Sequence, residues 1–323
     1  MNRHPLVSII IPMFNSENLI KDTLLSCLNQ TYDNIEVIIV NDGSTDKGES
    51  VVSQFVDDRI RYFKIDNSGA CVARNLGISH ARGEVVQFLD ADDVLDKDKI
   101  HFQLLKYREY GDEYVYSSNM GTVKGNAFTI DEGYELYQQD FEPKAYFRNL
   151  VNQFGKYLTT GAWLIPSRIV HSINGWDEKI KLNQDGEYMM RVILQSKGII
   201  YCEKSNFYYR RDVKDSVSKK RNKAIFESWL YSYLSYVDNF KKSFDNNTAN
   251  ELGWKALSVY YCSSYPNHPD LLKKCKEHMK KLGYSTPNAH GGKTFKKIAN
   301  YIGTDNALKI FELKKKMMRF FSF

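Results

Sequence analysis

The first hundred residues alternate short apolar segments with amphipathic ones, and this alternation limits the fold more than any other feature. Continuous β-branched and aliphatic runs predict buried strands at 7–12, 35–40, 60–65 and 85–89. Helical periodicity lies between them, at 16–30, 46–55 and 69–80. Strands that are apolar throughout and separated by helices indicate a mostly parallel central sheet with helices on both faces. The fold class is therefore α/β. On the first helix one face carries Leu19, Ile20, Thr23, Leu24, Cys27 and Leu28.

The pattern changes after residue 110. Further strands are predicted at 114–118, 162–165 and 198–202, with a helix over 185–195. The polar, tyrosine-rich segment 121–140 reads as a mobile loop. From residue 216 onward the periodicity is helical. These features predict an α/β domain over 1–215 and a helical C-terminal region over 216–323.

The charge is divided between these two parts. The chain has a net charge of +6, but residues 1–215 carry 25 Lys and Arg against 31 Asp and Glu, whereas residues 216–323 carry 20 against 8. A basic region of this kind can meet an anionic surface, and a membrane face is expected here rather than nucleic acid.

The last helical segment is amphipathic. One face is predicted to hold Ile310, Phe311, Met317, Met318 and Phe321, with lysines and an arginine opposite. Such a helix suits peripheral contact with a membrane. It equally suits docking on the α/β domain or on a second copy of the chain, so an oligomer stays possible.

Cysteine usage and hydropathy indicate a compartment. Five cysteines are scattered without metal-ligand spacing, which indicates free thiols in a reducing environment. The N-terminus leads into a strand without the apolar stretch of a signal peptide, and no run of about 18 apolar residues occurs. We expect a cytoplasmic protein, which the amphipathic last helix could place peripherally on the inner membrane face.

Polar clusters follow three of the predicted strands. They are Phe14-Asn15, the segment 41–44 (Asn-Asp-Gly-Ser), and the segment 90–93 (Asp-Ala-Asp-Asp). In doubly wound sheets ligands bind beyond the carboxyl ends of the strands. These clusters therefore mark the candidate binding edge.

The three aspartates of segment 90–93 would repel one another without a positive partner. Mg²⁺ or Mn²⁺ prefers oxygen ligands and is often held by one or two carboxylates plus phosphate. Capping of the following helix is one alternative. A calcium loop is another, but the spacing lacks the Gly and Glu of an EF-hand. The metal site is the favoured interpretation.

Asp42 could accept a hydrogen bond from N3–H of a uracil or thymine ring, a proton that cytosine lacks. Taken alone, the segment 41–44 is better explained as a turn, which its residues form readily.

Four blocks in order carry a family resemblance: 7–15 (VSIIIPMFN), 36–46 (EVIIVNDGSTD), 69–77 (GACVARNLG) and 83–93 (GEVVQFLDADD). A weaker continuation lies at 174–178 (NGWDE) and 184–191 (QDGEYMMR). Over about residues 5–215 the chain resembles the family-2 glycosyltransferases, whose nucleotide-sugar-binding α/β domain is called GT-A. The resemblance implies an inverting, metal-dependent transfer from a nucleotide-diphosphate sugar, with UDP favoured, to a glycan or lipid-linked acceptor in surface polysaccharide biosynthesis. The sugar would be a hexose or an N-acetylhexosamine.

The resemblance also implies roles for residues. Asp42 would bind the base, Arg74 would help to hold the nucleotide, Asp92 would lie near the ribose, and Asp93, with Asp92, would bind Mn²⁺ or Mg²⁺. Asp90 would support the strand end. At the end of the first strand, nucleotide-sugar contacts are expected from Pro12, Phe14 and Asn15.

Asp185 occupies the family's catalytic-base position. A carboxylate there would deprotonate the acceptor hydroxyl as it attacks the anomeric carbon. The chain departs from the pattern beside it, because many members have Glu-Asp where this one has Gln184-Asp185. A cap of the predicted helix is a compatible reading.

The segment 208–218 resembles the family's closing segment over the diphosphate. Arg210 and Arg211 are credible phosphate contacts. Asp212 stands where members commonly have His, so it is not assigned as a ligand. A solvated charged loop is an equal alternative.

Trp163 and Trp176 could stack on acceptor sugars. Burial in the core is the competing interpretation, and Trp176, in a turn near Asp185, is the better candidate.

Two other functions compete with glycosyl transfer. A sugar nucleotidyltransferase would need a glycine-rich loop after the first strand, where this chain has Met13-Phe14-Asn15. A non-catalytic nucleotide-sugar-binding protein would not need Asp42, Asp92, Asp93 and Asp185 together.

Overall fold

The computed structural model describes residues 4–125, 127–132, 134, 137–153, 157–211 and 222–320. Its contacts divide the chain into two compact units. An α/β unit comprises residues 1–143, 157–178 and 184–216, and a helical unit comprises 144–156, 179–183 and 217–323. The expected single boundary near 215 therefore omits two short segments, 144–156 and 179–183, that group with the helical unit.

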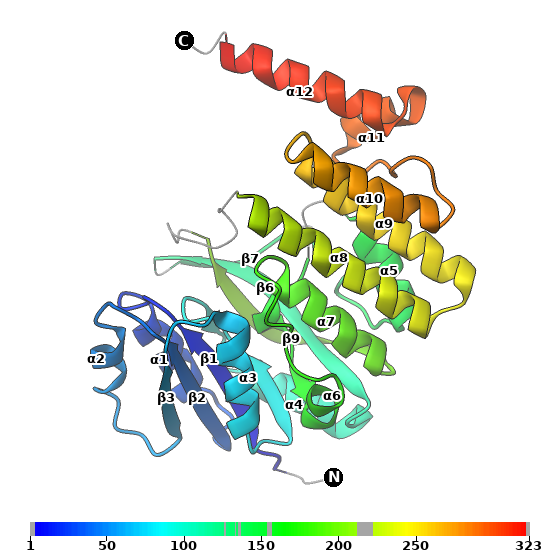
Figure 1. Ribbon diagram of the computed structural model, residues 1–323. Helices are drawn as coiled ribbons and strands as arrows, with labels where there is room; N and C mark the ends of the chain where they lie inside the picture. Colours follow the sequence, from blue (N-terminus) through cyan, green and yellow to red (C-terminus); the bar gives the residue numbers. More distant parts are fainter. Residues whose placement is uncertain are drawn as a thin grey trace. The chain divides into compact units, whose positions relative to one another are not determined.

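The central sheet of the α/β unit has the strand order β3-β2-β1-β4-β8. Its strands β1, β2 and β3 lie side by side in Figure 1. Strands β1 to β4 are parallel and β8 is antiparallel at the edge. Their bounds are β1 Val7–Met13, β2 Ile35–Asp42, β3 Ile60–Ile65, β4 Val85–Phe88 and β8 Ile165–Pro166. All residues of β1, β2 and β4 are buried, which explains why their sequences are apolar without alternation. The predicted α/β fold with a central sheet flanked by helices is confirmed.

The helices of this unit are α1 Ile20–Leu28, α2 Gly48–Val52, α3 Ala70–His80, α4 Lys99–Tyr110, α6 Ser167–Ser172 and α7 Gln184–Gln195. Helix α3 packs against β1 and β2. Its close approach depends on Gly77, where an added Cβ would lie 2.3 Å from Cγ2 of Ile10. The glycine thus sets the distance between helix and sheet, and with it the position of the first turn of α3.

A second sheet has the order β5-β9-β6-β7. Its strands are β5 Val94–Leu95, β6 Tyr114–Lys124, β7 Ala127–Ile130 and β9 Gly198–Arg210. Strands β6 and β9 are parallel, and β6 and β7 form an antiparallel hairpin. The expectation of a mobile loop over 121–140 is wrong for its first part, because β6 continues to Lys124 and pairs with β7.

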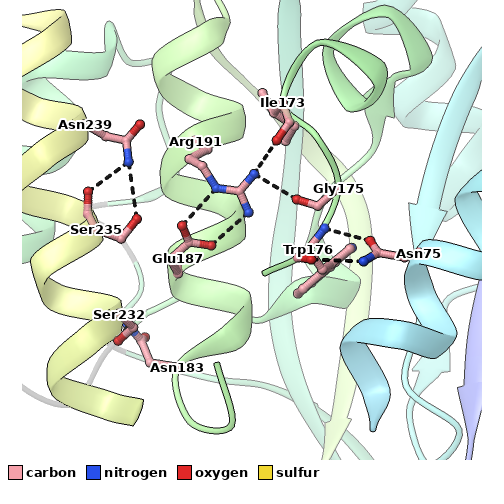
Figure 2. Close-up of polar contacts among 10 residues, drawn as sticks. All are labelled: Asn75, Ile173, Gly175, Trp176, Asn183, Glu187, Arg191, Ser232, Ser235 and Asn239. Carbon is pink, nitrogen blue, oxygen red and sulfur yellow. Dashed lines mark hydrogen bonds and ion pairs between the residues drawn. The ribbon is translucent and has the colours of Figure 1, made fainter. Parts of the chain in front are cut away.

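The helical unit contains α5 Pro143–Asn152 (its first residue in the α/β unit), α8 Lys223–Ser243, α9 Asn246–Ser264, α10 Pro269–Lys281, α11 Lys293–Ile302 and α12 Thr304–Phe320. Within it, α8 packs on α9, α10 contacts both, and α11 packs with α12. Segment 179–183 joins this unit through hydrogen bonds to α8. Lys181 N donates to Ser228 Oγ at 2.6 Å. Asn183 Nδ2 donates to Ser232 Oγ at 3.0 Å, and both of these side chains are drawn in Figure 2.

Within the residues that the structure describes, no helix is both long and apolar enough to cross a lipid bilayer.

Candidate functional site

The three aspartates of segment 90–93 lie directly after β4, at the carboxyl end of the parallel sheet. The segment is held from two sides. The hydroxyl of Thr23, on α1, lies 3.0 Å from the carbonyl oxygen of Ala91 and 2.9 Å from that of Asp93. From β9, Arg210 N donates to Asp93 Oδ1 at 2.9 Å, and Arg210 Nε donates to the Asp92 carbonyl at 2.9 Å. The aspartates therefore occupy fixed positions before any ligand arrives.

This fixed arrangement disfavours negative charge. Burial, together with the neighbouring Asp90 carboxylate, raises the pKa of Asp92 to about 6. Burial also raises the pKa of Asp93 well above its ordinary value, and Asp92 and Asp90 add to the shift. A bound cation would offset both the cost of burying these charged carboxylates and the repulsion between them. The oxygen donors of Asp92 and Asp93 thus fit a hard divalent metal.

A metal here would need ligands beyond the protein. Among the described residues, no group of three or more His, Cys, Asp or Glu side chains is arranged to hold a metal ion. Mg²⁺ and Mn²⁺ are commonly bound by one or two carboxylates with phosphate oxygens and water completing the shell. The acidic segment accordingly fits a metal that arrives with a phosphate ligand.

Arg74, on α3, connects the aspartates to α7. Its Nη2 donates to Asp90 Oδ1 at 2.6 Å, and its Nη1 lies 3.4 Å from Oε1 of Gln184, the first residue of α7. The guanidinium also lies over the Trp176 ring, 4.4 Å from its centroid. Its Nε is buried and has no hydrogen-bond partner among the described residues. Arg74 therefore keeps one buried N–H group that has no protein partner among the described residues.

Asp185 lies in the first turn of α7, next to Gln184. Burial raises the pKa of its carboxyl group above the ordinary value. The Gly186 backbone N–H and the Arg74 charge act in the opposite direction, while Asp90 adds to the rise. Asp90, Arg74 and Asp185 therefore lie close enough to influence one another. A carboxylate with a raised pKa, at the edge of a metal-fitting cluster, is suited to accept a proton.

Helix α7 is joined through Arg191 to the segment 173–176 (Figure 2). Arg191 pairs with Glu187 one turn away on α7, and its Nη1 donates to the carbonyls of Ile173 and Gly175 at 2.5 and 2.8 Å. Asn75, on α3, exchanges hydrogen bonds of 2.7 and 2.9 Å with the backbone of Trp176. The blocks at 174–178 and 184–191 thus form one clamp between α3 and α7.

Gly175 is required in that clamp. Its φ is +68°, and an added Cβ would lie 2.5 Å from Asn75 Oδ1. A side chain there would be strained and would also displace the amide that holds Trp176.

Asp42 lies at the end of β2, and its side chain is buried. Its Oδ1 accepts from Ser68 N at 2.6 Å and its Oδ2 accepts from Gly69 N at 2.9 Å. Gly69 precedes α3, so the carboxylate satisfies backbone donors at the start of that helix. The turn interpretation of segment 41–44 therefore accounts for part of the role of Asp42. A carboxylate has about four acceptor positions, which leaves capacity for a base N–H.

The end of β1 is joined to the same edge. Asn15 has a φ of +47°. Its Oδ1 accepts from Thr45 N at 2.8 Å, and its N donates to Ser44 Oγ at 3.1 Å. Pro12 is buried inside β1, whereas Phe14 is exposed. Of the three residues predicted at this strand end, Phe14 and Asn15 lie where a ligand can reach them and Pro12 lies inside the strand.

Arg210 and Arg211 differ in their surroundings. Arg210 is buried, and besides the bonds to the aspartate segment its Nη2 lies 3.3 Å from Asp22 Oδ2. Arg211 pairs with Asp131, and its side chain is 58% exposed. Arg210 thus supports the aspartates, and Arg211 is the more accessible of the two for phosphate. Residues 212–218, including Asp212, lie outside the described residues.

The expectation that Trp163 and Trp176 stack on acceptor sugars is wrong for this structure. Trp163 is 1% exposed and Trp176 is 2% exposed. One face of Trp176 is covered by Tyr188, with ring centroids 4.0 Å apart and planes at 3°, and Arg74 lies over its ring as well. Both indoles therefore belong to the core.

Sequence reasoning did not assign Thr23 to the site. Its signal was present, because Thr23 is a hydroxyl residue on the otherwise apolar face of the first helix. A buried hydroxyl requires a partner, and the partner is the aspartate segment.

An α/β sheet with acidic, buried residues after β4 and a carboxylate of raised pKa at the start of α7 is an arrangement that fits an enzyme of the transferase class. Residues 8–217 match the family described as glycosyl transferase family 2. The chain belongs to that family. The predicted family resemblance is confirmed.

Relatives share this assignment. Glycosyltransferase GlyA of Streptococcus pneumoniae serotype 4 is 31% identical over 240 residues, which are 71% of this chain and 33% of GlyA. An uncharacterized glycosyltransferase of Haemophilus influenzae is 44% identical over 136 residues, 41% of this chain and 51% of that protein. The chain therefore spans a third to a half of these relatives.

The fold is also found in solved structures. The crystal structure of S. aureus TarS 1–349 in complex with UDP-GlcNAc superposes with a TM-score of 0.69 at 16% identity, over 96% of this chain and 91% of that one.

Proposed function

We propose that the chain transfers a hexose or N-acetylhexosamine from a UDP-linked donor to a hydroxyl group of a glycan or lipid-linked acceptor, with inversion. The observation that carries the proposal is the position of Arg74. It contacts Asp90 after β4 and Gln184 at the start of α7, so that the aspartate segment and Asp185 form one site. A donor-binding cluster beside a proton acceptor is what glycosyl transfer requires.

The preference for UDP rests on two observations. The Asp42 carboxylate is fixed at the end of β2, where an acceptor for the N3–H of uracil is expected. TarS, which has the same fold, has been solved with UDP-GlcNAc and with UDP. In this arrangement the accessible Arg211 would bind phosphate oxygens, and Arg74 would help to hold the nucleotide through its contact with Asp90.

Asp93 and Asp92 would hold a Mn²⁺ or Mg²⁺ ion. When bound, such an ion supplies positive charge beside the diphosphate. The protein's part is to keep both carboxylates in place through Thr23 and Arg210, at a site where burial and repulsion between carboxylates disfavour their ionisation.

Asp185 would accept the proton of the acceptor hydroxyl. The acceptor oxygen then forms a bond to the anomeric carbon from the face opposite the diphosphate. The bond from that carbon to the diphosphate oxygen breaks, its electron pair leaves with UDP, and the configuration inverts. Burial raises the pKa of Asp185 and so makes it a stronger base than an exposed carboxylate.

The relatives and the cysteines support the biological setting that we propose. A chain named minor teichoic acid biosynthesis protein GgaA, of Bacillus subtilis, is 27% identical over 285 residues, 82% of this chain and 61% of GgaA. This supports a role in making a surface polysaccharide. All five cysteines are free, which supports a reducing, cytoplasmic site of action.

The first test is calorimetric titration of UDP into the protein with and without Mn²⁺, repeated for Asp93→Ala. Metal-dependent binding that is lost in the variant supports the donor site. Binding that is indifferent to both metal and Asp93 contradicts the metal role, and absence of UDP binding contradicts the donor assignment.

The second test measures UDP release from a panel of UDP-sugars in the presence of glycan acceptors. Asp185→Asn is expected to bind UDP normally and to lose turnover by roughly 10²–10⁴-fold. Asp58→Asn is the control, because Asp58 is exposed and precedes β3 at the opposite end of the strand from the site. Equal loss in both variants would contradict the role of Asp185.

A further inference from the structure

Helix α12 has two apolar faces, and only one of them is used inside the helical unit. Ala307 and Leu308 are buried in the hydrophobic cluster of that unit, and Phe311 packs against it. The Phe311 ring meets the Phe295 ring of α11 edge to face, with centroids 5.4 Å apart. Asp305, in the first turn, accepts hydrogen bonds from Tyr261 and Lys276. The N-terminal half of α12 is therefore anchored, with its orientation fixed by Phe311.

The sequence pattern placed Phe311 on the same face as Ile310 and Met317, and the structure separates them. Ile310 is 48% exposed, while Leu313 and Met317 are each 60% exposed. Their spacing of three and four residues puts them in one row along the helix. Phe311 points to the core of the unit, so the exposed row is a second apolar face. A row of three large aliphatic side chains in water is unfavourable unless something covers it.

Positive charge lies on both sides of this row. Lys309 and Lys316 fall next to it on one side of the helical wheel, and Lys314 on the other, with all three exposed. Between residues 309 and 318 there are four lysines and one acidic residue, Glu312. A second α12 would bring the same positive charge to the same face, which disfavours self-association. Anionic lipid headgroups are complementary to the lysines, and the acyl boundary is complementary to the aliphatic row.

We propose that α12 lies on the surface of an anionic lipid bilayer, with Ile310, Leu313 and Met317 inserted among the headgroups and the lysines bound to lipid phosphates. The proposal concerns membrane attachment alone and does not depend on the donor or the reaction. The anchored half of the helix would hold the chain to the bilayer through Phe311 and Asp305.

The test is co-sedimentation of the full chain with vesicles of phosphatidylcholine alone and of phosphatidylcholine with 30% phosphatidylglycerol (roughly the anionic content that draws basic segments to a bilayer). The wild type is expected to bind the anionic vesicles at least tenfold more tightly, and to be released by salt. The triple variant Lys314→Glu, Lys315→Glu, Lys316→Glu and the double variant Leu313→Ser, Met317→Ser are each expected to lose more than tenfold in affinity.

A charge-matched control is provided by α10. Lys273, Lys274 and Lys281 are exposed there, and their replacement by Glu changes the net charge equally. The control is expected to keep its affinity within about twofold. A loss as large as that of the α12 triple variant would overturn the proposal, because binding would then follow net charge alone. Equal affinity for both vesicle types, or none for either, would also overturn it.

The oligomeric state tests the alternative that a second copy of the chain, and not a lipid bilayer, covers the aliphatic row of α12. Light scattering behind gel filtration is expected to give the same mass for the wild type and for Leu313→Ser, Met317→Ser. A wild-type dimer that the double variant converts to monomer would assign the aliphatic row to a second copy and overturn the proposal. Thermal unfolding of each variant shows whether its fold is intact, and the exposed positions are expected to leave the midpoint unchanged.

Discussion

The ammonium group of Lys99 lies 2.5 Å from Oε1 of Gln87 and 2.7 Å from Oε1 of Gln103, in a fully buried position. Gln87 is on β4 and Lys99 is the first residue of α4. Their contact therefore joins the two elements that flank the segment with the three aspartates. Gln87 and Gln103 in turn donate to carbonyls of the 3₁₀ turn Thr160–Ala162. The buried Lys99 side chain and the two glutamine amides therefore link the site segment to the turn Thr160–Ala162.

This position predicts a pH dependence of stability. Burial lowers the pKa of Lys99 from 10.5 to about 7. The penalty for charging it in the folded state is fully present below pH 7 and disappears as pH rises to the unfolded pKa. Between these values the unfolded chain binds one more proton, so Lys99 makes stability rise by up to about 1.4 kcal/mol per pH unit. Urea unfolding of wild type and Lys99→Met at pH 7.5–9 measures the difference in slope, and parallel curves would contradict the assignment.

Thr23→Val tests the tether on the aspartate segment. The valine keeps the shape of the side chain but removes the hydroxyl that bonds the carbonyls of Ala91 and Asp93. We expect a loss of about 1–2 kcal/mol in unfolding free energy and weaker Mn²⁺-dependent binding of UDP. Thr23→Ser is the matched control, since it restores the hydroxyl. If both variants bind UDP like the wild type, the tether does not position the aspartates.

Gln184→Glu restores the acidic pair that many family members have. The new carboxylate would lie near Arg74 and next to Asp185, and a nearby negative charge raises the pKa of a carboxyl group. The proposed base Asp185 can accept a proton only when it is deprotonated, so the acid limb of the kcat profile should move to higher pH. Gln54→Glu, an exposed change before β3, is the control. An unchanged acid limb in Gln184→Glu would remove Asp185 as the group that the profile reports.

Arg74→Lys tests whether geometry matters beyond charge. A lysine keeps the positive charge but cannot contact Asp90 and Gln184 together while lying over the Trp176 ring. We expect at least a tenfold loss of kcat/KM, with a smaller effect on UDP affinity. Near wild-type kinetics would show that Arg74 acts only as a point charge.

The central sheet was predictable because its strands are buried on both faces, which leaves continuous apolar runs in the sequence. The hairpin of β6 and β7 was not, since all of β7 is exposed and no buried face imposes a pattern on it. Trp176 was misassigned because its partner Tyr188 lies twelve residues away, a separation without any local signal.

The site was predictable at its acids and not at their supports. Asp90, Asp92 and Asp93 stand together in the sequence, so their mutual repulsion can be inferred without a structure. Lys99 reads as an ordinary surface lysine, because its partners Gln87 and Gln103 come from a strand and from the next helical turn. Their meeting depends on tertiary packing.

The carboxylate of Asp42 has a consequence for how such a chain can evolve. Both of its oxygens are bound to the backbone at Ser68 and Gly69, so the residue is part of the start of α3 whether or not a nucleotide is present. A mutation of Asp42 that changed the base contact proposed above would also loosen the start of the helix that carries Arg74. Selection for a different nucleotide through Asp42 would therefore be opposed by the stability of the fold itself.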